Sequence, residues 1–112
     1  MPKIAPRATS RYTAEALNYL GLLIRERRIR RKETVAELAE RAGVSRGLLQ
    51  RIERGDPGCS IGAVFEVAAL LDLRLFDLDR ERLLGERERL TQTLSLLPRT
   101  ARMKEKPLKD DF

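Results

Sequence analysis

The sequence predicts an all-α fold in which a compact five-helix domain ends in an extended C-terminal helix and a tail. Apolar residues recur every three or four positions in several stretches, as they do along one face of a helix. Serine, threonine and aspartate, which favour helix N-termini, precede these stretches. Glycine or proline follows several of them, where a helix would end.

Composition limits the classes of protein to which the chain can belong. Its 112 residues suffice for one domain with a modest core, and a formal net charge of +6 favours an anionic partner. There is no apolar run of about 18 residues and no signal-peptide pattern, so we expect a cytoplasmic protein with no membrane partner. One cysteine cannot form an internal disulfide, and the lack of histidine removes the commonest general base and metal ligand. Carboxylates and lysines remain, but they form no catalytic motif, so we expect no enzyme, no cofactor and no metal.

The N-terminal part is expected to be an arm followed by a long helix. Residues 1–12 contain two prolines and little periodicity, which is typical of a flexible arm. Thr13 can cap a helix that runs to about Arg31. The inward side of this helix carries the aliphatic residues Leu17, Leu20, Ile24 and Ile29, with Tyr19 and Leu23 as further candidates. Residues 25–32, RERRIRRK, form a basic cluster, most of which we expect to be a solvated face.

Residues 34–55, TVAELAERAGVSRGLLQRIERG, predict two short helices joined by a tight turn. Thr34 and Glu37 have the spacing of a capping box, and Ser45 can cap the second helix. Glycines that suit the left-handed end of each helix stand at Gly43 and Gly55. The side that faces the core carries Val35, Leu38, Ala39, Ala42, Leu49 and Ile52. Two helices around a glycine-containing turn form the helix-turn-helix unit that binds DNA, although any small helical bundle contains such hairpins.

The second of these helices carries side chains that suit contact with double-stranded DNA. The base-contacting candidates are Arg46, Gly47, Gln50 and Arg51. Arginine can bind guanine, and glutamine adenine, through two hydrogen bonds each, while glycine allows the helix to approach the groove. The phosphate-contacting candidates are Thr34, Ser45 and Arg54. The alternative for all of them is an ordinary solvated helix face.

A fourth helix is expected to close the core. Ser60 can cap it, and its amphipathic stripe carries Ile61, Val64, Phe65, Ala68 and Leu71. Residues 72–79 have apolar side chains at alternate positions, so a short extended segment is an alternative structure for this stretch. The helix-turn-helix domain is expected to span residues 13–78.

The C-terminal part, residues 79–97, is expected to form one helix, capped by Asp79 and ended by Pro98. Its apolar residues form a narrow seam of Leu83, Leu90, Leu94 and Leu97. So narrow a seam suits contact with a single helix. It either docks on its own domain or pairs with the same helix of a second subunit to form a homodimer. Residues 98–112 are expected to be a flexible or partner-binding tail.

The motif AELAERAGVS-x-x-x-L-x-x-IERG, residues 36–55, resembles the Xre-type helix-turn-helix family, which is related to the lambdoid phage repressors. The resemblance covers about residues 20–73 and places the base contacts on the four candidates given above. It also implies a structural ion pair between Arg28 and Glu53, whose alternative is two surface charges. The sequence departs from the family at Lys32 and Glu33, where glycine and an apolar residue are usual. The resemblance therefore does not predict the conformation of the turn between the first two helices.

A narrower resemblance follows the second helix. RGDPG-x-SIG, Arg54 to Gly62, and the terminal DDF resemble HipB-like antitoxins, the DNA-binding partners of HipA-like kinase toxins. This resemblance implies a nucleoid-associated, homodimeric repressor that binds an operator with inverted half-sites, controls its own operon and binds a kinase toxin. The alternatives are a free-standing Xre-type regulator without a toxin and a basic helical module that binds an acidic protein.

Overall fold

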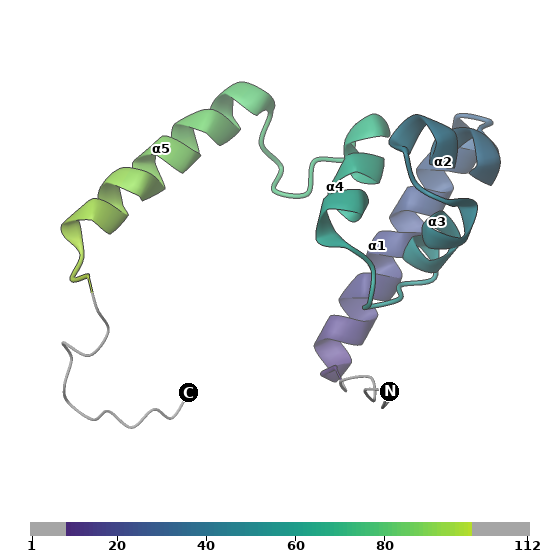
Figure 1. The fold of residues 1–112 in the computed structure, drawn as a ribbon, viewed down its shortest axis with the longest axis horizontal. Helices are drawn as coiled ribbons and strands as arrows, with labels where there is room; N and C mark the ends of the chain where they lie inside the picture. The colour runs from purple at the N-terminus through teal and green to yellow at the C-terminus, as the bar shows by residue number, and fades with distance from the viewer. Residues whose placement is uncertain (1–8, 100–112) are drawn as a thin grey trace. The chain divides into compact units, whose positions relative to one another are not determined.

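The computed structural model describes residues 9–99, so most of the predicted arm and tail lies outside the described residues. It contains five helices and, between residues 9 and 99, no strand, which confirms the all-α prediction (Figure 1). The helices are α1 (Arg11–Arg30), α2 (Val35–Ala42), α3 (Arg46–Glu53), α4 (Ile61–Leu70) and α5 (Arg80–Leu96). The short extended segment considered for residues 72–79 is absent, because turns and bends occupy this stretch.

The chain divides into two compact units, Met1–Leu75 with α1 to α4 and Phe76–Phe112 with α5. Within the first unit, α3 packs against both α1 and α2, and α2 also packs against α4. No helix between residues 9 and 99 is long and apolar enough to cross a membrane.

Every helix begins at a side chain that caps its first turn. Thr34, Ser45, Ser60 and Asp79 are N-caps as predicted, and each accepts a hydrogen bond from a backbone N–H three residues later. Thr34 and Glu37 form the full capping box. The prediction that Thr13 caps the first helix is wrong. Ser10 has the extended backbone of a cap, and its hydroxyl accepts from the N–H of Thr13 at 3.1 Å, so the helix starts one turn earlier.

The four helices of the first unit end in the same way. A residue with positive φ follows each helix, and the next residue donates its N–H to the carbonyl five positions back. The positive-φ residues are Lys32, Gly43, Gly55 and Asp72. Gly43 and Gly55 stand where the sequence predicts helix ends. Lys32, with φ of 60°, takes the left-handed position in the turn between the first two helices, so this turn forms without a glycine.

The core is formed by seven buried residues from all four helices and the end of α4: Ile24, Leu38, Ala39, Leu49, Ile52, Val67 and Leu71. Three residues expected on inward faces lie at the surface, since Tyr19 is 64%, Ile29 49% and Ile61 73% exposed. Phe65 is also exposed, and the buried side of α4 carries Val67 in its place. The sequence of α4, IGAVFEVAAL, is apolar almost all round, so its periodicity fits two overlapping stripes.

A glycine allows α1 and α3 to come into backbone contact. A Cβ atom added at Gly21 would lie 2.8 Å from the carbonyl oxygen of Ile52 and 2.7 Å from the carbonyl carbon of Glu53. Real Cβ atoms essentially never come so close to other atoms. The end of α3 is therefore seated against α1 at a position where only glycine fits.

Candidate nucleic-acid interface

The structure gives α2, the turn at Gly43 and Val44, and α3 the order of a helix-turn-helix unit. Leu38 and Ala39 of α2 and Leu49 and Ile52 of α3 are buried, so both helices are held to the core by one side. The other side of each helix is then free to contact a partner.

The exposed side of α3 carries three of the four predicted base-contacting residues. Arg46, Gly47 and Gln50 are all exposed. Gln50 follows Gly47 by three positions and Arg46 by four, so it shares a helix face with both. Within residues 9–99, the side chains of Arg46 and Gln50 make no hydrogen bond or ion pair. At Gly47 an added Cβ would meet nothing closer than the Ser45 hydroxyl, at 4.0 Å, so no neighbour in the fold requires a glycine there.

Arg51, the fourth candidate, is engaged within the protein. Its Nε donates to Asp56 Oδ2 at 3.0 Å, and Asp56 Oδ1 accepts from the backbone N–H of Gly58 at 2.8 Å. These contacts fix the loop after α3. The hydrogen bond from Gly58, followed by that from Arg51, lowers the pKa of the Asp56 carboxyl below its ordinary value. The base contact of Arg51 stays a prediction.

Arg28 and Glu53 form a buried ion pair with two hydrogen bonds between the guanidinium and the carboxylate. Arg28 Nε donates to Glu53 Oε2 at 2.7 Å, and Nη2 donates to Oε1 at 3.1 Å. Arg28 Nη1 also donates to the carbonyl oxygen of Glu33 at 2.9 Å. The hydrogen bond with Glu53 raises the pKa of the guanidinium above its ordinary value, although burial acts in the opposite direction. Arg28 thus connects α1 to the end of α3 and to the turn before α2.

The basic cluster at the end of α1 is mostly exposed, as expected, but two of its arginines also bind the end of α4. Arg27 Nη1 donates to the carbonyl oxygen of Leu71 at 2.7 Å, and Arg31 Nη1 to that of Leu70 at 2.9 Å. Arg31 also pairs with Asp72. The last carbonyls of a helix lack partners within it, and these two arginines supply them for α4. The sequence gives no signal of this role, because the carbonyls belong to a helix about 40 residues later.

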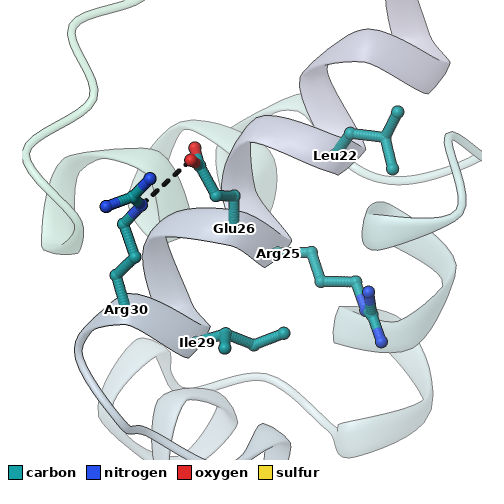
Figure 2. A pocket seen from close by; sticks show the side chains of 5 residues that line it. All are labelled: Leu22, Arg25, Glu26, Ile29 and Arg30. Carbon is teal, nitrogen blue, oxygen red and sulfur yellow. Dashed lines mark hydrogen bonds and ion pairs between the residues drawn. The ribbon is translucent and has the colours of Figure 1, made fainter.

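Two further arginines of this cluster behave differently from each other. Arg30 Nε pairs with Glu26 at 2.9 Å. Arg25 extends from α1 away from that pair, as Figure 2 shows, and makes no hydrogen bond or ion pair through its side chain within residues 9–99. Arg25 lines a pocket with residues of α2 and α3.

The predicted phosphate-contacting residues lie at the starts of α2 and α3 and just after α3. Thr34, Ser45 and Arg54 are exposed. The hydroxyls of Thr34 and Ser45 already accept cap hydrogen bonds, from Glu37 N and Leu48 N, so either would contact a phosphate as a donor.

The predicted dimerisation leucines belong to the second unit and are exposed there. Leu83, Leu90 and Leu94 lie on α5, which has no buried residue. Leu97 is the extended C-cap, because the proline that follows it disfavours a helical backbone, so it lies beyond the helical turns.

Within residues 9–99, no three or more histidine, cysteine, aspartate or glutamate side chains gather in a group that could hold a metal ion. Cys59 is half-buried, and this burial raises the pKa of its thiol, which favours the unreactive protonated form.

Comparison with known proteins agrees with this geometry. Residues 19–84, more than half of the chain, match the family described as a helix-turn-helix domain. No curated protein and no solved structure matches the chain. The match contains all of α2, α3 and α4 and most of α1, so it includes the whole helix-turn-helix unit and the elements that support it. The chain therefore belongs to the helix-turn-helix domain family, of the Xre and lambda-repressor type, and is a DNA-binding regulator.

Proposed function

We propose that the protein is a sequence-specific transcriptional repressor, not an enzyme, which binds an operator with inverted half-sites as a homodimer. One observation carries the proposal: α3 presents Arg46, Gly47 and Gln50 on a single exposed face, with both polar side chains unengaged in the fold. Side chains already committed to other contacts would have to break them before they could bind base edges.

The chemistry of this face suits the DNA major groove. An arginine such as Arg46 can donate two hydrogen bonds to guanine O6 and N7, and a glutamine such as Gln50 can pair with adenine N6 and N7. Each such pair contributes about 1–3 kcal/mol of discrimination between bases. Thr34, Ser45 and Arg54 would fix the register of the helix by contacts to phosphates, which carry no sequence information.

Repression follows from occupancy of the duplex. One eight-residue helix contacts few base pairs, so two copies on inverted half-sites would supply the required specificity. The exposed leucines of α5 are the candidate surface for this pairing. A dimer that covers its operator excludes other proteins from the same stretch of DNA.

We further propose that this repressor is the antitoxin of a HipA-like kinase toxin and controls its own operon. Support comes from the resemblance of Arg54 to Gly62 to HipB-like antitoxins. In the structure this segment spans the loop between α3 and α4, which Asp56 organises through Arg51 and Gly58. A kinase-like gene next to this one, and co-purification of its product, would support the role. Their absence would favour a free-standing regulator.

The experiment that tests base recognition compares a selected operator duplex with random DNA. Arg46→Ala and Gln50→Ala are each expected to weaken binding to the operator by about ten- to a hundredfold, corresponding to ~1–3 kcal/mol, and to change binding to random DNA much less. Arg30→Ala is the matched control, because it removes the same charge from a residue already paired with Glu26. Equal losses on both duplexes would show that Arg46 and Gln50 contact only phosphates.

A further inference from the structure

We propose that Arg25 of α1 and Arg54 after α3 together hold one backbone phosphate of the DNA, in the pocket that they line with Gln50. This inference rests on the proposed function and extends its interface from the helix-turn-helix unit to α1. Arg25 is not among the residues predicted to contact DNA.

The pocket lies where residues of three helices come together. It has a volume of about 380 Å³ and is lined by residues from α1, the start of α2 and the end of α3: Arg25, Arg28, Val35, Gln50, Glu53 and Arg54. Gln50 is a predicted base contact, and Val35 follows Thr34, a predicted phosphate contact. The pocket thus lies between a candidate base-contacting side chain and a candidate backbone contact, where a strand flanking the groove would pass.

The charge of this pocket is positive. Three arginines line it against one carboxylate. Both oxygens of the Glu53 carboxylate accept hydrogen bonds from Arg28, so that pair is internally neutralised. Within residues 9–99, Arg25 and Arg54 have no ion-pair partner, which leaves their two charges available to an anion.

Arg25 differs from its neighbours in the basic cluster. Arg27 and Arg31 donate to the carbonyls that end α4, Arg28 binds Glu53, and Arg30 binds Glu26. Arg25 alone among these arginines makes no such contact within the described residues. In Figure 2 its guanidinium points away from Glu26 and Arg30. Among the described residues no contact engages this cation, and it lines the cationic pocket beside α3.

Phosphate is the anion that fits both the chemistry and the position. The planar guanidinium donates two parallel hydrogen bonds to phosphate oxygens, and two arginines that line one pocket can bind the same group. Such a contact would fix the angle at which α3 enters the groove without distinguishing between bases.

The test is the salt dependence of binding by the full chain to the selected operator and to random DNA. Arg25→Ala is expected to weaken both complexes by a similar factor and to leave their ratio unchanged. It should make the negative slope of log K against log salt shallower by about 0.9 for each bound subunit, the value for one lost phosphate contact on duplex DNA. Arg25→Lys keeps the charge and should retain the slope. Arg30→Ala, which removes an arginine of the same helix, should also retain it.

A second measurement locates the phosphate. Neutral methylphosphonate groups are placed one at a time along the operator. At one position, the loss of affinity seen with the wild-type protein should vanish in Arg25→Ala, because the contact is already absent. The proposal would be overturned if the salt slope of Arg25→Ala equalled that of the wild type or of Arg30→Ala. It would also be overturned if methylphosphonate substitution at every position cost Arg25→Ala as much affinity as it costs the wild type.

Failure of this inference is separable from failure of the proposed function. If Arg46→Ala and Gln50→Ala abolish discrimination while Arg25→Ala leaves the slope intact, the phosphate site is wrong and the base-reading face stands. If discrimination is unaffected by Arg46→Ala and Gln50→Ala, the base-reading face is wrong, whatever the slope of Arg25→Ala.

Discussion

A buried ion pair connects the end of α3 to α1 within the first unit. The side chains of Arg28 and Glu53 are only 9% and 7% exposed, and each satisfies the charge of the other. Such a pair adds little net stability compared with apolar residues, since both charges lose their hydration. Its importance lies in what happens when one partner is removed, because the remaining charge is then buried alone.

We therefore predict that Arg28→Met lowers the free energy of unfolding by about 3–5 kcal/mol. Arg28→Met combined with Glu53→Leu should recover most of that loss, because no buried charge then remains. Urea denaturation of the full chain measures both effects. The control, Arg30→Ala, breaks an exposed pair with Glu26 and should cost at most about 1 kcal/mol. A double variant as unstable as Arg28→Met would contradict this account.

Among the elements, α1 and α3 determine where the candidate interface lies. The backbone of α3 at Ile52 and Glu53 touches α1 at Gly21. The ion pair between Arg28 and Glu53 also joins α1 to the end of α3. A change in the spacing of these two helices would shift the exposed face of α3 and the pocket beside it together.

Gly21→Ala is predicted to destabilise the protein by at least ~1–3 kcal/mol, the usual cost of overpacking, because backbone atoms of α3 cannot yield as a side chain does. Gly62→Ala in α4 is the matched control. Its added Cβ would meet nothing closer than the Ser60 hydroxyl, at 3.9 Å, so its stability should stay within ~1 kcal/mol of the wild type. Urea denaturation again measures the difference. Equal stability of the two variants would show that α1 and α3 are not in backbone contact.

These elements also show what sequence alone could predict. Four of the five N-caps and the helix ends at Gly43 and Gly55 were predictable, because single residues with strong local preferences define them. The end at Lys32 was not, since lysine has no strong preference for the left-handed backbone. The Glu33 carbonyl that follows it accepts from Arg28, which is itself held by Glu53 from α3. The placement of Val67 rather than Ile61 in the core was equally inaccessible, because only the position of the other helices selects one stripe of α4.

The candidate interface divides along the same line. The exposure of Arg46, Gly47 and Gln50 follows from helix periodicity, since the opposite face carries Leu49 and Ile52. The engagement of Arg51 by Asp56, and the convergence of Arg25 on the same corner as Gln50, depend on tertiary contacts that no local pattern encodes.

For the whole molecule, the proposed homodimer requires a surface through which two copies can pair. The leucines of α5 are the candidate surface: Leu83 is 42%, Leu90 52% and Leu94 65% exposed. Successive members differ in direction by no more than about 40° on the helix, so they form one narrow stripe. Burial of these exposed leucines would be favourable, because it removes apolar surface from water. Contact with the equivalent stripe of a second copy would bury them.

We predict that Leu90→Asp combined with Leu94→Asp converts a dimer into a folded monomer, because pairing would bring four carboxylates into an apolar contact. Light scattering gives the mass, and circular dichroism gives the fold. Leu84→Asp with Leu96→Asp is the matched control, since both leucines are exposed on α5 but lie about 100° or more from the neighbouring seam leucine. The control should remain dimeric and bind inverted half-sites about 34–36 Å apart, whereas the monomer should bind each half-site separately and weakly. A seam variant with the mass of the wild type would reject α5 as the dimer contact while leaving the recognition face of α3 intact.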